Sequence, residues 1–189
     1  MGDKPWGKEM GANQGGTDEW YTPVEAVMPL LPFLKKGSRI LCPFDTDESQ
    51  YVKCLSKDHS VAYSHISQGK DFFLLDKPDV DYIISNPPYS TRTEVLKQLY
   101  KWDIPFALIL NSNGLFDSVT RSLLARGGVE LLFLYPRVKY IDTQGTRSAP
   151  PYQSVYWCHN ILPKQIMFAD IEDPCGQQMD INDFLGDKQ

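Results

Sequence analysis

Short apolar runs and segments of helical spacing alternate along most of this chain. Apolar runs bounded by glycine, proline or small polar residues predict buried strands at 39–43, 60–66, 80–85, 106–110 and 129–134. Between them, apolar residues that recur at helical spacing predict helices at 24–34, 49–55, 91–100 and 118–125. Strands that alternate with helices are typical of a mostly parallel sheet covered on both faces. The sequence therefore predicts a doubly wound α/β fold.

The first predicted helix has recognisable limits. Thr22 is placed to cap it, Pro23 takes its first position, and Gly37 follows its last apolar residue. Pro29 and Pro32 lie inside this pattern, and proline lacks the backbone N–H that a helix interior requires. We therefore expect a helix that is kinked, or shorter than its apolar spacing implies.

The last two apolar segments are connected differently from the others. Val138–Ile141 and Ser154–Cys158 are separated by the polar segment 142–153 and not by a helix. Two strands connected in this way are expected to pair with each other in antiparallel fashion. The sequence therefore predicts that they add an antiparallel edge to the sheet.

The length and composition fit one compact domain. The chain has 189 residues, 42% of them hydrophobic, which is enough for a core that needs no disulfide or metal. Residues 1–17 are rich in glycine and predict a flexible lead-in, 18–169 predict a single domain, and 170–189 predict an acidic tail. No stretch approaches the roughly 18 apolar residues of a membrane helix, and the chain starts without the apolar segment of a secretory signal. We therefore expect a cytoplasmic protein with no membrane contact.

The cysteines do not form a metal-binding pattern. They are far apart, with no Cys-x-x-Cys pair and no histidine at zinc-ligand spacing. We therefore predict no metal site, and thiols that are buried and reduced. The residues concerned are Cys42, Cys54, Cys158 and Cys175.

The distribution of charge matters more here than the net charge of −5. Segment 170–189 has six acidic residues and one lysine, and so accounts for the whole net charge. Segment 92–147 has eight basic residues and five acidic ones, which makes it the part of the chain suited to phosphate groups. Ordinary solvated charges explain the same composition equally well.

The strongest chemical signal is the sequence Asn86-Pro87-Pro88-Tyr89, directly after the strand predicted at 80–85. Ligands of open α/β sheets bind beyond the carboxyl ends of strands. Two prolines fix the backbone and remove two N–H donors, so Pro87 and Pro88 offer only their carbonyls, as acceptors. The Asn86 side chain and the Pro87 carbonyl are then able to accept both hydrogens of a planar amino group, which makes its nitrogen a nucleophile. Tyr89 offers that group a ring on which to stack. The alternative interpretation is that the motif is only a structural turn at the end of the strand.

With this motif, the chain resembles the amino-group methyltransferases that use S-adenosylmethionine, and among them the EcoRI-type and phage-encoded DNA adenine-N6 methyltransferases. The resemblance extends over residues 18–162 and keeps the family's order, in which cofactor segments precede the amino-group motif. Besides the motif, it rests on the segments 18–23, 42–49, 63–66, 69–73, 137–141 and 148–152. It implies a seven-stranded Rossmann-like methyltransferase sheet, S-adenosylmethionine as cofactor, and methyl transfer to N6 of adenine in DNA in a bacterial or phage-infected cell.

Positions that match the family's motifs receive roles from the resemblance. Asp45 is expected near the ammonium of the cofactor and Phe44 against its sulfonium. Asp71 is expected to accept from the adenine amino group of the cofactor, and Phe72 to pack on the adenine ring. The cofactor-binding residues implied are Tyr21, Thr22, Pro23, Pro43, Phe44, Asp45, His65, Asp71, Phe72 and Asn86. The catalytic residues implied are Asn86, Pro87, Pro88 and Tyr89.

Two features depart from the family's pattern. The first loop has no glycine between Leu41 and Lys53, although the EcoRI-type branch looks similar there. Where the second strand usually ends in an acidic residue that binds the ribose hydroxyls, this chain has Ser64 and His65. His65 either bonds a hydroxyl instead or only packs.

The sequence leaves the acceptor open. A glutamine side-chain amide or an RNA base presents the same planar amino group to the same motif, and a methyltransferase-like module that no longer catalyses is a further alternative. The chain has no room for a large target-recognition domain. Either the recognised DNA site is short, or selectivity is low, or a partner protein supplies the specificity.

The polar segment 142–153 is the predicted contact with DNA. A loop of this length in a compact domain is more often functional than idle, and we expect it beside the motif. Arg137, Lys139 and Arg147 are the predicted phosphate ligands, and Tyr89 is the predicted stacking partner of the base. Removing the three charges is expected to lower the salt dependence of DNA binding by about 0.9 per lost contact.

Overall fold

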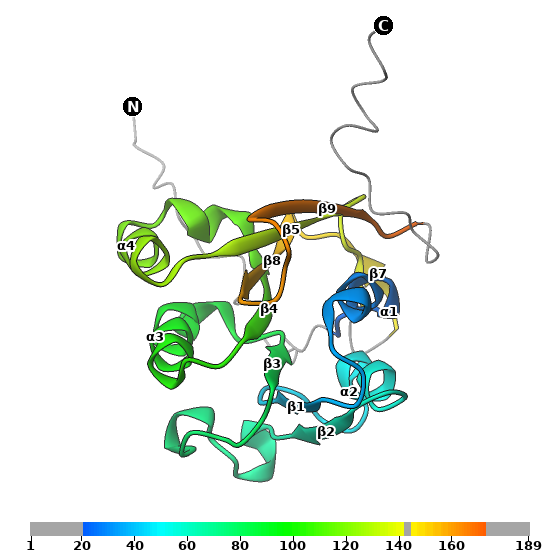
Figure 1. Ribbon diagram of the computed structural model, residues 1–189. Helices are drawn as coiled ribbons and strands as arrows, with labels where there is room; N and C mark the ends of the chain where they lie inside the picture. Colours follow the sequence, from blue (N-terminus) through cyan, green and yellow to red (C-terminus); the bar gives the residue numbers. More distant parts are fainter. Residues whose placement is uncertain (1–20, 142–144, 173–189) are drawn as a thin grey trace, which may run out of the picture.

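The computed structural model describes residues 21–141 and 145–172 (Figure 1). The predicted lead-in, nearly all of the predicted acidic tail and the first three residues of the predicted DNA-binding loop, 142–144, therefore lie outside the described residues. Within the described residues, the chain builds one large sheet with helices on both of its faces.

Seven strands form this sheet in the order β2-β1-β3-β4-β8-β5-β9. Their bounds are β1 Arg39–Cys42, β2 Ser60–Tyr63, β3 Tyr82–Ser85, β4 Phe106–Asn111, β5 Glu130–Tyr135, β8 Ser154–His159 and β9 Ile166–Asp170. Neighbouring strands are parallel, except that β8 runs antiparallel to both β4 and β5. The predicted doubly wound, mostly parallel sheet is confirmed.

Two layers of helices cover the sheet. The helical elements are α1 Val24–Val27, η1 Met28–Phe33, α2 Gln50–Leu55, α3 Arg92–Trp102 and α4 Ser118–Gly127, where η marks a 3-10 helix. Ile40 and Ile84 pack in the cluster that contains α1, η1 and α2, whereas Leu41 and Ile83 pack in the cluster that contains α3 and α4. Because successive strand residues point to opposite faces, the continuous apolar runs of the strands supply both clusters.

The antiparallel strand lies inside the sheet, which corrects the predicted antiparallel edge. All residues of 154–158 are buried, and β8 pairs with a neighbour on each side. A strand without a solvated face fits the middle of a sheet and not its edge. The predicted pairing of Val138–Ile141 with this strand is also wrong, because β6 (Tyr140–Ile141) pairs with β7 (Arg147–Ser148) in a separate small sheet.

The edge beside β5 is formed by β9, a strand that the sequence pattern does not predict. Met167 and Ala169 are partly buried against the core, whereas Ile166 and Phe168 are exposed. The alternation of buried and exposed residues covers only this short segment, which continues directly into the acidic residues after 170. The sequence pattern around β9 is therefore typical of a tail and does not predict a strand. The Ile171 N–H still donates to the carbonyl of Tyr135 at 2.6 Å.

The first helix is short, as its prolines predict. α1 ends at Val27 and the chain continues as the 3-10 helix η1, with Pro32 inside it. The predicted Thr22 cap is wrong, because the helix begins at Val24 and Pro23 takes the N-cap position without a side-chain hydrogen bond. Proline also disfavours helical backbone in the residue before it, which keeps Thr22 outside the helix.

Candidate functional site

The segments that carry the predicted site meet at the carboxyl ends of the parallel strands, and this side of the sheet is called the ligand-binding edge below. β1, β2 and β3 are parallel neighbours, so their carboxyl ends lie on the same side (Figure 1). Segment 43–45 follows β1, segment 64–65 follows β2, and the motif 86–89 follows β3. In open α/β sheets this is the edge where ligands bind. The fold therefore brings together three groups of candidate residues that are far apart in sequence.

Asp45 is the buried centre of this edge, with 8% of its surface exposed. The Ser49 hydroxyl donates to Oδ1 of Asp45 at 2.5 Å, and the Ser85 hydroxyl donates to Oδ2. Ser85 Oγ also accepts from the backbone N–H of Phe44 at 3.3 Å. Because Ser85 directly precedes Asn86, one hydroxyl joins the loop after β1 to the motif after β3.

Burial raises the pKa of Asp45 to about 6, and the hydrogen bonds from Ser49 and Ser85 and the nearby His65 only partly offset this. None of the salt bridges in the described part of the chain includes Asp45. A buried carboxylate without a cationic partner is suited to a positively charged ligand.

The loop after β1 adopts its conformation without glycine. Residues with positive φ occur elsewhere in the described chain, and none lies within 43–49. A glycine is required only where the backbone enters the left-handed region or must approach another group closely. The glycine-free sequence of this loop therefore imposes no backbone strain.

His65 and Asp71 each cap a short 3-10 turn. Nδ1 of His65 accepts from the N–H of Ser67 at 3.3 Å at the start of η2 (Ile66–Gln68). Oδ1 of Asp71 accepts from the N–H of Phe73 at 2.9 Å at the start of η3 (Phe72–Leu74). A neutral imidazole whose Nδ1 accepts carries its proton on Nε2. The remaining polar atom of His65, Nε2, is thus a donor, and the remaining polar atom of Asp71, Oδ2, is an acceptor.

Phe72 packs in the core and does not present an open face. Its side chain is 3% exposed, and its ring centroid lies 4.9 Å from that of Phe44 and 5.2 Å from that of Trp102. The neighbouring Phe73 is 43% exposed. The ring that is exposed at this place therefore belongs to Phe73, and the stacking role of Phe72 stays a prediction.

The local structure of the motif uses the carbonyls of Pro88 and Tyr89 and leaves the predicted acceptors available. The Pro88 carbonyl accepts from the N–H and the hydroxyl of Thr91 at 3.2 and 3.3 Å, where η4 (Tyr89–Thr91) forms. Among the described residues, none donates a hydrogen bond to the Asn86 side chain or to the Pro87 carbonyl. These are the two oxygens that the amino-group chemistry requires.

Tyr89 is held in place by other tyrosines. Its ring meets that of Tyr152 edge to face, with centroids 5.6 Å apart. Burial, and then the neighbouring Tyr140, raise the pKa of Tyr89 far above its ordinary value. Tyr140 in turn donates to the hydroxyl of Ser154 at 2.9 Å. The plane of the Tyr89 ring is therefore fixed before any ligand binds, and Tyr152 forms a wall beside it.

Segment 21–25, which carries predicted cofactor-binding residues, is hydrogen-bonded and salt-bridged to the segment that carries the residues predicted to contact DNA. Tyr21 and Ile141 form an antiparallel bridge, with backbone hydrogen bonds of 2.8 and 3.1 Å. Arg147 forms a salt bridge with Glu25 of α1, with 2.5 Å between Nη1 and Oε1. Segment 21–25 and the small sheet of β6 and β7 therefore form one structural unit.

Two of the three cations predicted to contact DNA already have partners within the chain. Arg137 donates to the carbonyl of Pro150 at 3.1 Å, and Arg147 pairs with Glu25. Lys139 is exposed. Arg137 and Arg147 therefore hold the segment beside the motif in place, and their contact with phosphate stays a prediction.

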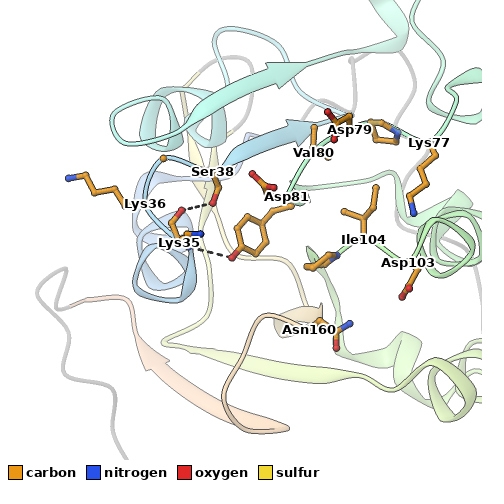
Figure 2. Close-up of a pocket in the computed structure, with 14 residues that line it drawn as sticks. Lys35, Lys36, Ser38, Lys77, Asp79, Val80, Asp81, Asp103, Ile104 and Asn160 are labelled. Atoms are coloured by element: carbon orange, nitrogen blue, oxygen red, sulfur yellow. Dashed lines mark hydrogen bonds between the residues drawn. The ribbon is translucent and has the colours of Figure 1, made fainter.

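A depression of about 590 Å³ lies at the opposite edge of the sheet (Figure 2). Ser38, Asp81 and Ile104 line it just before β1, β3 and β4, at the amino ends of parallel strands. Asp81 is bound by Arg39, at 3.4 Å between their side chains. This depression contains none of the predicted site residues and lies away from the ligand-binding edge.

The described residues show two further absences. They contain no group of three or more histidine, cysteine, aspartate or glutamate side chains placed to hold a metal ion. No helix among them has the length and apolar character needed to cross a membrane. Cys42, Cys54 and Cys158 are buried free thiols, as predicted, and Cys175 lies outside the described residues.

Sequence reasoning missed Ser49, Ser85 and Tyr152 as parts of this edge. Ser49 lies four positions after Asp45, a spacing that places side chains together in a tight turn, and Ser85 is the residue directly before the motif. These positions are the signals that identify the two serines. Tyr152 has no comparable signal, because its contact with Tyr89 depends on how distant segments pack.

Comparison with known proteins gives matches among solved structures but no family. No family model and no curated protein matches the chain. Among solved structures, the chain is similar to the protein-(glutamine-N5) methyltransferase (release factor-specific) from Alicyclobacillus acidocaldarius, with a TM-score of 0.41 and 16% identity. The match covers 72% of this chain and 88% of that one. A likeness of this degree does not establish a shared activity or substrate.

Proposed function

We propose that this protein transfers a methyl group from S-adenosylmethionine to the N6 amino group of adenine in DNA. The observation that carries the proposal is the position of Asn86-Pro87-Pro88-Tyr89 beside the buried Asp45, with Ser85 joining the two. The motif suits an amino-group acceptor, and the buried carboxylate suits a cationic donor. The choice of DNA adenine rests on the sequence resemblance.

The residues at this edge fit the proposed cofactor. No salt bridge among the described residues includes Asp45, and an ammonium group would balance its charge. Thr22 Oγ1 is buried without a hydrogen-bond partner in the described part of the chain, which a ligand group or water must satisfy. His65 has a donor suited to a ribose hydroxyl, and Asp71 has an acceptor suited to an adenine amino group. The cofactor would supply a methyl group on a sulfonium, which is already activated.

The motif acts on the acceptor nitrogen. When the Asn86 side chain and the Pro87 carbonyl accept its two hydrogens, the nitrogen lone pair is directed at the methyl carbon and no longer delocalised into the ring. Alignment and preorganised acceptors then provide the rate enhancement. The methylated nitrogen is cationic and loses its proton readily, so no dedicated base is required. Adenine in a duplex must first flip out, at a cost of a few kcal/mol that stacking on Tyr89 helps to offset.

Asp71→Ala is expected to weaken cofactor binding by about 1 to 3 kcal/mol, because the adenine amino group loses its acceptor. Isothermal titration calorimetry with S-adenosylmethionine measures this directly. Because Asp71 also caps η3, Asp71→Asn serves as the second variant, since it keeps an oxygen for the N–H of Phe73. Asp76→Ala, at an exposed position nearby, is the matched control. Unchanged affinity in Asp71→Ala would place the adenine elsewhere.

A methyl-transfer assay with labelled S-adenosylmethionine tests the function itself. The full chain is incubated separately with duplex DNA, with RNA and with a protein that exposes glutamine side chains. Label on adenine N6 of DNA supports the proposal. Label on RNA or on glutamine retains methyl transfer but corrects the acceptor. Cofactor binding without transfer to any of them favours a non-catalytic module.

A further inference from the structure

The guanidinium of Arg92 occupies a preformed slot close to the motif. Arg92 is the first residue of α3 and lies six positions after Asn86. Its Cζ is 5.8 Å from the ring centroid of Trp157. On another side it contacts Gly114 in η5 (Ser112–Phe116), where an added Cβ would lie 2.7 Å from Nη1 and 2.8 Å from Cζ. A glycine at this position is therefore required for the guanidinium to lie where it does.

The charge of Arg92 has little compensation. Its side chain is only 15% exposed, and Nε is buried without a hydrogen-bond partner in the described part of the chain. The carboxylate of Asp117 is 4.0 Å from Nη2, too far for a hydrogen bond, and 46% exposed. Oδ1 of Asp117 is also occupied, because it accepts from two N–H groups at the start of α4. A guanidinium this buried normally has hydrogen-bonded partners.

Arg92 lies on the ligand-binding edge of the sheet. β3 and β4 are parallel neighbours, the motif follows β3, and η5 follows β4. Arg92 stands between these two segments, because it is in sequence with the first and in contact with the second. A cation at the first turn of a helix is disfavoured by the helix dipole, so the stability of α3 does not account for it.

We propose that Arg92 binds a phosphate of the DNA backbone next to the adenine held by the motif. A guanidinium can bond a phosphate through two parallel N–H groups, and the slot at Gly114 and Trp157 fixes the plane of that fork. This inference rests on the proposed function and adds a phosphate contact to the acceptor side. It also supplies a guanidinium that donates no hydrogen bond to a described residue, unlike those of Arg137 and Arg147.

The test is DNA binding over a range of salt concentrations. A fluorescent duplex oligonucleotide is titrated with the full chain in the presence of saturating S-adenosylhomocysteine, and anisotropy gives the dissociation constant. Arg92→Gln is expected to bind about tenfold or more weakly and to lower the slope of log affinity against log salt by about 0.9. Arg92→Lys is expected to retain the slope but not the full affinity, because lysine lacks the fork.

Two further variants test the geometry of the slot. Gly114→Ala retains every charge but displaces the guanidinium, so it is expected to weaken DNA binding as Arg92→Gln does. Asp117→Asn keeps an oxygen for the cap of α4 and removes the competing charge, so it is expected to strengthen DNA binding. Arg121→Gln, on the exposed side of α4, is the matched control and is expected to bind DNA with the wild-type slope.

The outcomes separate this inference from the proposed function. Thermal unfolding and cofactor titration are measured on each variant, so a loss of DNA binding counts only where fold and cofactor affinity are retained. If the wild type methylates DNA and Arg92→Gln shows the same affinity and slope, the phosphate contact is wrong and the function stands. If the wild type methylates a protein glutamine and binds no DNA, the phosphate contact is wrong as well. If the wild type binds no S-adenosylmethionine, the proposed function itself fails.

Discussion

Asn86→Ala is expected to lower the rate of methyl transfer by about 100-fold or more, with the fold and the cofactor affinity unchanged. Asn86 follows the last residue of β3, and its side chain receives no hydrogen bond from a described residue, so its loss removes no hydrogen bond of the described part of the chain. What it removes is one of two acceptors that hold the amino group in position. Single-turnover rates with saturating DNA and cofactor measure the effect on chemistry alone.

Two variants control this experiment. Asn86→Asp keeps an oxygen acceptor at the same position, so it is expected to be faster than Asn86→Ala. Asn113→Ala, an exposed asparagine on η5, is expected to react at the wild-type rate. If Asn86→Ala transfers methyl groups nearly as fast as the wild type, the catalytic assignment of the motif is wrong.

The strands and helices could be predicted because each is encoded locally. Continuous apolar runs such as Phe106–Leu110 are typical of strands buried on both faces, and the structure places that run in the middle of the sheet. The order of the strands is not local information. Ser154–Cys158 is as apolar as a central strand, yet the connection from Ile141 suggested a hairpin, and pairing with β4 and β5 is decided by long-range packing.

In the candidate site too, some residues could be identified from local sequence, whereas others depend on long-range contacts. Asp45 and Asn86 could be identified because each follows an apolar run, and ligand-binding residues of α/β sheets lie there. The roles of Ser85 and Arg92 depend on contacts between distant parts of the chain: Ser85 bonds a carboxylate 40 positions away, and the guanidinium of Arg92 needs a glycine in η5. No periodicity or motif in the sequence reports such contacts.

Burial also decides which of two predicted aromatic residues has a ring available for stacking on a ligand. The sequence places Phe72 and Tyr89 after strands, where a ring suits stacking on a ligand. In the folded protein Phe72 is enclosed by Phe44 and Trp102, whereas Tyr89 keeps a fixed plane beside Tyr152. Which rings remain open depends on side chains from other elements, so a single segment cannot reveal it.

The contribution of Asp45 to the stability of the cofactor-free protein is expected to fall as pH rises from 4 to 6. Its pKa is about 6 in the folded protein against an ordinary 3.8, so the folded state holds a proton that the unfolded chain releases. This stabilising proton is fully present below the unfolded pKa and lost as pH rises through the folded one. Above that range the buried charge costs about 3 kcal/mol, and Asp45→Asn is expected to unfold less readily than the wild type.

Cofactor binding is expected to have the opposite dependence on pH at the same residue. An ammonium group needs the ionised carboxylate, so the affinity of the wild type for S-adenosylmethionine should fall about tenfold per pH unit below 6 and level off above it. Asp45→Asn should bind weakly at every pH from 5 to 8, although it is the more stable protein. Calorimetric titration and urea unfolding across this range measure both effects.

His65 is the control for these measurements, because it is the nearby side chain whose charge acts on Asp45. His65→Gln should keep the fall in affinity below pH 6, whereas Asp45→Asn should lose it. If His65→Gln removes the pH dependence and Asp45→Asn retains it, the carboxylate is not the group that meets the ammonium. At neutral pH the ionised carboxylate of Asp45 lowers the stability of the cofactor-free protein, and a cation bound beside it offsets that cost. The two variants measure this dependence of Asp45 on a ligand.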